Sequence, residues 1–128
     1  MHGMSESAVR AADVRGAAPT AEEGFRRLAI GDQALLASVC SPGAPHSAVR
    51  RLDARTEALL RIGALIALDA PPSSYRAEVE AAQRAGARID DLLAVLVGVA
   101  GVVGSARVIS AAPRIALAAG YDIDAALE

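Results

Sequence analysis

The chain has 128 residues, a length that suits one domain; 53% of its residues are apolar and only 2% are aromatic. Its 13 basic and 15 acidic residues give a net charge of −2, which argues against a nucleic-acid partner because such a surface needs a basic excess. Cys40 is the only cysteine, which excludes an intramolecular disulfide and a cysteine-rich zinc site and favours a cytoplasmic location.

The chain begins with a polar stretch and continues with two short predicted helices. Residues 1–18 show no strong period and no apolar run of signal-peptide type, so we expect a flexible leader before a domain over residues 19–128. Thr20 and Glu23 form a capping box, which predicts the start of the first helix. Asp32 is the expected cap of the second helix.

The middle of the chain predicts a loop and two longer helices. The segment around His46 is rich in Pro and Gly, as loops are. Asp53 is the expected cap of the helix that follows, which carries an apolar stripe. That stripe consists of Leu59, Ile62, Leu65 and Ile66. After the break "APPSS", Ser73 or Ser74 is the expected cap of a helix that ends at Gly86.

The last third of the chain is the most apolar. Asp90 is the expected cap of a helix that is apolar on nearly all sides. The uncharged run over residues 92–106 is shorter than the roughly 20 residues of a membrane span, so we expect a buried helix and no membrane partner. A monomer of this size could hardly bury it, so a homo-oligomer is expected. Pro113 should kink or split the final long helix, and Gly120 should end it.

No segment alternates apolar and polar residues with period two. The chain is therefore predicted to be all-α, a bundle of about six helices with short connections.

Two segments carry a family resemblance: "LDARTEALLRIGALIAL" (52–68) and "YRAEVEAAQRAGARIDDLLAVLVGVAGVVGSARVISAA" (75–112). Their helix start, their helix–Gly–acid junction and the Gly-spaced apolar helix resemble the carboxymuconolactone decarboxylase and alkylhydroperoxidase D superfamily over residues 22–121. The resemblance implies an alkylhydroperoxidase D-like fold and assembly as a homotrimer or homohexamer.

The redox members of this superfamily carry Cys-x-x-Cys with a histidine four residues after the second cysteine. Measured from Gly86, these positions fall on Pro71, Ser74 and Glu78. In a register shifted by one residue they fall on Ala70, Ser73 and Ala77. Neither register contains a cysteine or a histidine, so the resemblance implies a variant without thiol redox chemistry, and a peroxidase is the less favoured alternative.

The candidate site residues follow from the same stretch. Glu78 is four residues after Ser74 and three after Tyr75, so the three can share one helix face, which corresponds to the active-site mouth of the family. Glu78 is the candidate catalytic acid or base, with Ser74 and Tyr75 as candidate substrate-binding residues. Helix-end stabilisation by Glu78 and capping by Ser74 are the structural alternatives. Arg107 interrupts an apolar stretch and is expected to hold an anionic ligand or to form an ion pair.

Two functional classes remain open. The first is a non-redox enzyme of the decarboxylase or isomerase type, or a binding protein, that acts on a small organic acid. The second is a catalytically silent structural or interaction protein that forms a homo-oligomer. Neither class is expected to need a metal or another cofactor, and a ligand in a polar pocket would favour the first. The roles of His46 and Cys40 stay open.

Overall fold

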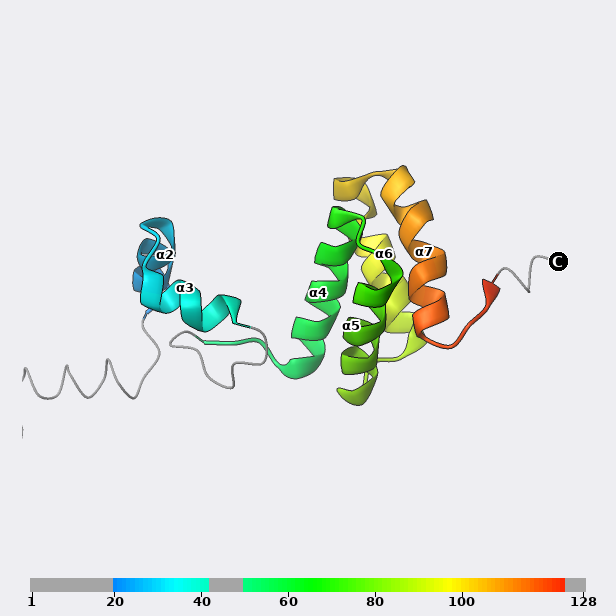
Figure 1. The fold of residues 1–128 in the computed structure, drawn as a ribbon, viewed down its shortest axis with the longest axis horizontal. Coiled ribbons are helices and arrows are strands. Elements are labelled where there is room, and N and C mark those ends of the chain that lie inside the picture. Colours follow the sequence, from blue (N-terminus) through cyan, green and yellow to red (C-terminus); the bar gives the residue numbers. More distant parts are fainter. Residues whose placement is uncertain (1–19, 42–49, 124–128) are drawn as a thin grey trace, which may run out of the picture. The chain divides into compact units, whose positions relative to one another are not determined.

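The computed structural model describes residues 20–41 and 50–123, and in these ranges it has six helices and no strand (Figure 1). The helices are α2 (Ala21–Ala29), α3 (Gln33–Cys40), α4 (Ala54–Leu68), α5 (Pro72–Arg84), α6 (Ile89–Val103) and α7 (Ser105–Ala118). The predicted all-α class is confirmed for these residues. Contacts divide the chain into two compact units, one before Leu52 and one from Leu52 onward. The predicted leader and His46 lie outside the described residues.

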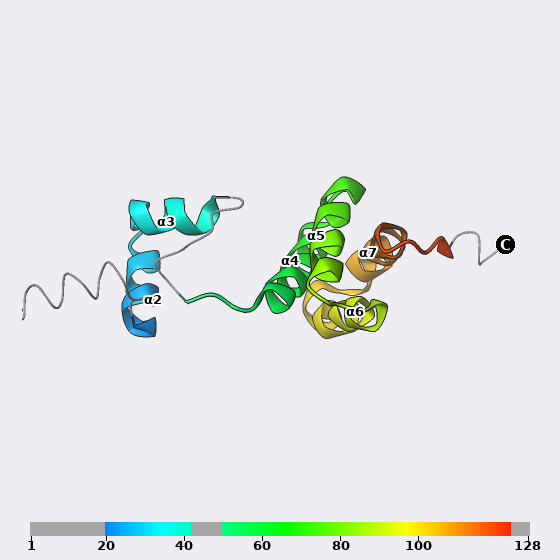
Figure 2. The same ribbon diagram turned by 90° about the horizontal axis from the view of Figure 1, so that it is seen from below.

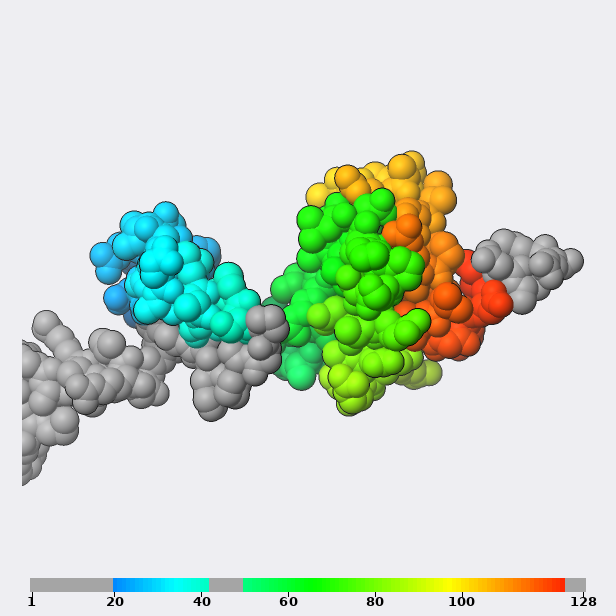
Figure 3. All heavy atoms as spheres, viewed as in Figure 1, coloured from blue at the N-terminus to red at the C-terminus, as the bar shows by residue number. Residues whose placement is uncertain are grey.

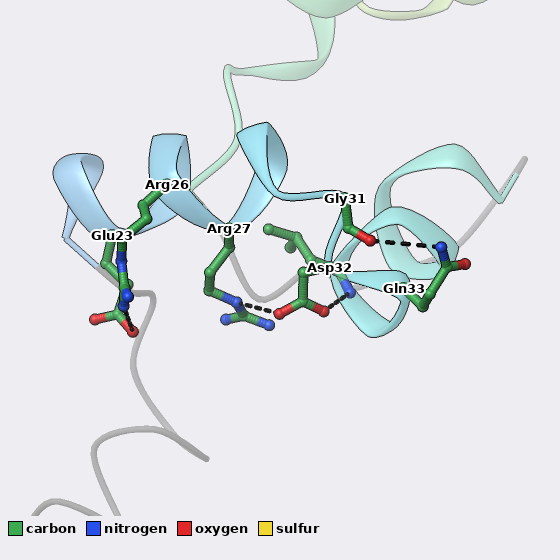
Figure 4. Close-up of polar contacts among 7 residues, drawn as sticks. Glu23, Arg26, Arg27, Gly31, Asp32 and Gln33 are labelled. Atoms are coloured by element: carbon green, nitrogen blue, oxygen red, sulfur yellow. Dashed lines mark hydrogen bonds and ion pairs between the residues drawn. The ribbon is translucent and has the colours of Figure 1, made fainter.

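The first unit contains α2 and α3, joined by a tight turn; we call it the α2–α3 hairpin. The Thr20 side chain accepts a hydrogen bond from the Glu23 amide at 3.2 Å, which confirms Thr20 as the cap. The other half of the predicted capping box does not form, because the Glu23 carboxylate pairs with Arg26. Asp32 caps α3 by accepting from the Leu35 amide at 3.1 Å, and it also accepts from Arg27 Nε at 2.9 Å (Figure 4). One carboxylate therefore fixes both helices at the turn.

The second unit contains α4 to α7, and successive helices run in opposite directions (Figure 1). Helix α4 packs against α5 and α6, and α7 packs against the same two helices. Helices α5 and α6 therefore lie at opposite corners of a four-helix arrangement (Figure 2). On the face drawn in Figure 3, α5 (green) and α7 (orange) lie against each other.

The core of the second unit lies on the inner faces of these helices. Its largest fully buried side chains are Ile62, Ile66, Tyr75, Val79 and Leu92. The stripe predicted on α4 is confirmed, because its two isoleucines are fully buried and its two leucines pack partly buried against them. Helix α4 also approaches α6 closely at Gly63, where a Cβ atom would lie 3.4 Å from Val99 Cγ1.

The predicted cap of α5 is wrong. Its first residue is Pro72 and its N-cap is Pro71, so Ser73 and Ser74 lie inside the first turn and no side chain caps the helix. A proline suits the first helical position because its missing N–H would be unpaired there and its φ is already helical. The Pro-Pro pair therefore starts the helix one residue before the first serine.

The predicted cap of α6 is wrong as well. The N-cap is Arg88 rather than Asp90. The next carboxylate, Asp91, reaches back to accept a hydrogen bond from the Arg88 amide at 2.8 Å. It also forms an ion pair at 2.8 Å with Arg55 of α4, which ties the start of α6 to the start of α4.

Helix α7 is not split at Pro113, which lies inside one continuous helix. The proline leaves the carbonyl of Ile109 without its usual amide partner. The helix continues because Ala111 and Ile115, on either side of the proline, are both buried in the core. Among the helices of the described ranges, none combines the length and the apolar character that crossing a membrane requires.

Candidate functional site

The three candidate residues of α5 have different surroundings. Tyr75 lies in the core with 0% of its surface exposed. Ser74 and Glu78, one helical turn apart, are half-buried. Of the three, Tyr75 is therefore the residue whose polar group is enclosed by the fold.

The hydroxyl of Tyr75 is buried and has no hydrogen-bond partner among the described residues. Leaving such a group unpaired costs about 1–3 kcal/mol, so most buried hydroxyls have a partner in protein or water. Burial raises the pKa of this phenol; the positive charge of Arg114 partly opposes the shift, and the negative charge of Asp69 adds to it. The hydroxyl therefore stays protonated at neutral pH and can act as a hydrogen-bond donor.

Two polar side chains of α7, Ser110 and Arg114, hold the α4–α5 connection in place by hydrogen bonds. Asp69, the C-cap of α4, has a left-handed backbone with φ of +51°. Ser110 Oγ donates to Asp69 Oδ1 at 2.7 Å, and Arg114 Nη1 donates to the Ala70 carbonyl at 2.7 Å and lies 3.5 Å from Asp69 Oδ1. We call Asp69, Ser110 and Arg114 the Asp69 cluster. It fixes the chain just before the helix that carries Tyr75.

Sequence reasoning missed the Asp69 cluster. Ser110 and Arg114 lie 41 and 45 residues after Asp69 in the sequence. All three are polar residue types that are common on protein surfaces, so nothing in the sequence links them. The signal that could have drawn attention to it is an aspartate placed directly between an apolar helix and the Ala-Pro-Pro break. At that position the chain must reverse direction between two helices, and side chains of a neighbouring helix are needed to stabilise the turn.

Arg114 also borders a pocket of about 330 Å³. The pocket is lined by Pro72, Pro113, Arg114, Leu117, Tyr121, Asp122 and Ile123. It combines an apolar wall with one basic and one acidic side chain, and such a mixture suits a small molecule with a polar end. A second pocket of about 290 Å³ lies between α6 and α7 and has an almost wholly apolar lining.

The other candidates have different surroundings. Arg107 is exposed in the first turn of α7, and no bond joins it to the described residues, so water solvates its charge. On α4, Glu57 forms an ion pair at 3.8 Å with Arg61, four residues later on the same helix face. Cys40 is exposed on α3. Within residues 20–41 and 50–123, no three metal-ligating side chains gather into a group that could hold an ion.

Comparison with known proteins adds no relative. No protein-family model matches the chain, and neither a curated protein nor a solved structure matches it.

Proposed function

We propose that this protein is a homo-oligomeric, carboxymuconolactone decarboxylase-like protein of the cytoplasm that lacks thiol redox chemistry. In this proposal it binds a small organic acid and acts on it as a decarboxylase or isomerase. The family part rests on the two sequence segments quoted above. The absence of thiol redox chemistry rests on the single cysteine, Cys40, which lies on a different helix from the positions of the missing pair.

The observation that carries the proposal is the unpaired, buried hydroxyl of Tyr75. A carboxyl or carbonyl oxygen of a ligand would supply the missing acceptor. Arg114 supports the same ligand chemistry, because its bonds to the described residues use Nη1 alone and leave its other nitrogens for a carboxylate. Asp69 already balances part of the arginine's charge, so a second donor would strengthen the site. Tyr75 does not line the pocket beside Arg114, so in this proposal the start of α5 shifts when the ligand binds and brings the hydroxyl into contact with it. Glu78, half-buried on the same helix, is the proposed acid or base.

Replacing Tyr75 by phenylalanine tests this proposal. Titration calorimetry with a panel of small mono- and dicarboxylic acids should find a ligand whose affinity falls by about tenfold or more in Tyr75→Phe, because one hydrogen bond to a charged group is lost. Urea unfolding of the unliganded variant should show stability equal to or above the wild type, since an unpaired polar group is removed.

Ser73→Ala is the matched control, because Ser73 is exposed on the same helix and should affect neither measurement. A panel in which no acid binds, or a Tyr75→Phe variant that binds with wild-type affinity, would contradict the proposed ligand site. A clear loss of stability in Tyr75→Phe would show that the hydroxyl already has a partner in the unliganded protein.

The second candidate function is a catalytically silent structural or interaction homo-oligomer. It is favoured by the outer face of α6, which we define as Leu93, Ala94, Val97, Gly98, Gly101 and Val102. All six residues are exposed in the single chain, with Val97 70% and Val102 89% exposed. A charge-free apolar face of this kind is typical of a surface that another protein covers. Assembly without any acid binding would favour this second candidate.

A further inference from the structure

The α2–α3 hairpin leaves most of its large apolar side chains exposed. Leu35 is its one large side chain in the core, whereas Phe25 is 75% and Ile30 72% exposed. The two helices have only 9 and 8 residues, and isolated helices of this length are marginal in water. The hairpin therefore needs a covering surface to be stable.

The acidic side chains of α2 lie at its start and the basic ones at its end. Glu22 and Glu23 lie in its first turn and Arg26 and Arg27 in its last. Arg27 is committed to Asp32 within the turn (Figure 4). Glu22 and Arg26 are four residues apart, so they lie on one edge of the helix, next to the face of Phe25.

These two charges are available to a partner. No bond joins Glu22 to the described residues, and Arg26 forms only an exposed pair with Glu23 at 3.6 Å. Helix α3, with the sequence QALLASVC, has no charged residue at all. The charged side chains that a partner of the hairpin could contact, Glu22 and Arg26, therefore lie along one edge of α2.

We propose that the α2–α3 hairpin is a self-association module, which binds the same hairpin of a second copy with the two α2 helices antiparallel. A two-fold axis through the middle of α2 places Glu22 of each copy beside Arg26 of the other. The same arrangement covers Phe25 and Leu28 on both copies. A parallel arrangement would instead bring like charges together at both ends.

The charge order is what favours a second copy over other partners. Any apolar surface could cover Phe25, but it would gain nothing from opposite charges at the two ends of α2. A second α2 helix gains two ion pairs at once, because an isologous contact repeats every interaction. Electrostatic complementarity of this kind fixes register and orientation.

Two single charge reversals test the proposal in the full-length chain. Glu22→Arg makes this edge of α2 wholly positive and Arg26→Glu makes it wholly negative, so each variant should repel itself. A mixture of the two should associate on the order of three- to tenfold more tightly than either alone at low salt, and the difference should shrink in high salt. Association through any other surface contributes equally to all combinations and cancels in the comparison.

The double variant carrying both reversals is the control, because it restores opposite charges and should self-associate like the wild type. Circular dichroism checks that helix content is equal in all variants. Equal association in every combination would overturn the proposal. So would a Phe25→Glu variant that lowers the melting temperature but leaves self-association unchanged, because the hairpin would then be covered by its own chain.

Discussion

The carboxylate of Asp91 shows how much one side chain contributes at a helix start. The hydrogen bond from the Arg88 amide and, next to it, the Arg55 guanidinium lower the pKa of Asp91 below its ordinary value of 3.8. The folded state therefore binds a proton less readily than the unfolded state. Its contribution to stability is complete above pH 3.8 and is lost as pH falls through the folded-state pKa.

Asp91→Asn should therefore have a lower melting temperature than the wild type at pH 7, and the difference should disappear in strong acid. Thermal unfolding followed by circular dichroism between pH 2 and pH 7 measures this. Asp90→Asn is the neighbouring control and should change little, because no hydrogen bond joins Asp90 to the described residues. A difference that persists unchanged in acid would rule out the charge of Asp91 as its cause.

Single residues were predictable where the partner is close in sequence. Thr20, Asp32 and Asp53 cap helices by bonding to an amide three residues later, as the sequence predicts. Arg114 was not predictable, because its partners at the α4–α5 connection come from a segment 44 and 45 residues away. The inward direction of Tyr75 likewise depends on how α5 packs, and local spacing cannot supply it.

At the scale of elements, one glycine of α4 matters to helix packing in a way that the sequence did not indicate. Gly63 lies on the buried side of α4, and a Cβ atom there would be 3.4 Å from Val99 Cγ1 and 3.7 Å from Val95 Cγ1. An alanine therefore just fits, whereas a larger side chain would push α4 and α6 apart.

Gly63→Ala should leave stability unchanged or raise it by up to about 1 kcal/mol, because alanine is the better helix former. Gly63→Leu should lower it by about 1–3 kcal/mol through overpacking. Urea unfolding measures both. Ala64→Leu is the control, since Ala64 is the next residue of α4 but is exposed, and the fold should tolerate a larger side chain there. Equal effects of leucine at the two positions would show that Gly63 is not a close contact.

Helix boundaries separate what sequence could predict from what it could not. All six described helices were anticipated, because the apolar period and the terminal glycines mark them. Gly86 and Gly120, each expected to end a helix, have positive φ values of 93° and 96°. Two helix starts were missed. At Pro72, a proline pair starts the helix in place of the expected serine cap. At Ile89, the carboxylate that bonds the helix start is Asp91, one position after the expected Asp90.

At the scale of the whole molecule, the sequence predicted that α6 is too apolar for a monomer to bury. In the single chain, α6 buries Leu92 and Leu96 and leaves its outer face exposed. The apolar surface that one chain leaves uncovered lies on the side of α6 away from the core, and we propose that the oligomer uses it. Assembly as a trimer or hexamer remains a prediction, and two valines of α6 distinguish assembly from folding.

Val102 is 89% exposed, whereas Val95 is half-buried and faces Gly63 on α4. Val102→Asp should therefore fold with wild-type helix content but dissociate the oligomer, because a charge buried in an interface is left unpaired. Val95→Asp should instead unfold the chain, or lower its melting temperature sharply, because the charge lies between two packed helices. Light scattering at micromolar concentration should show at least three copies of the 13.0 kDa chain for the wild type and at most two for Val102→Asp, because the α2–α3 hairpins can still pair. A wild-type protein that is already monomeric would disprove the assembly, and a Val102→Asp variant that assembles normally would place the interface elsewhere than on the outer face of α6.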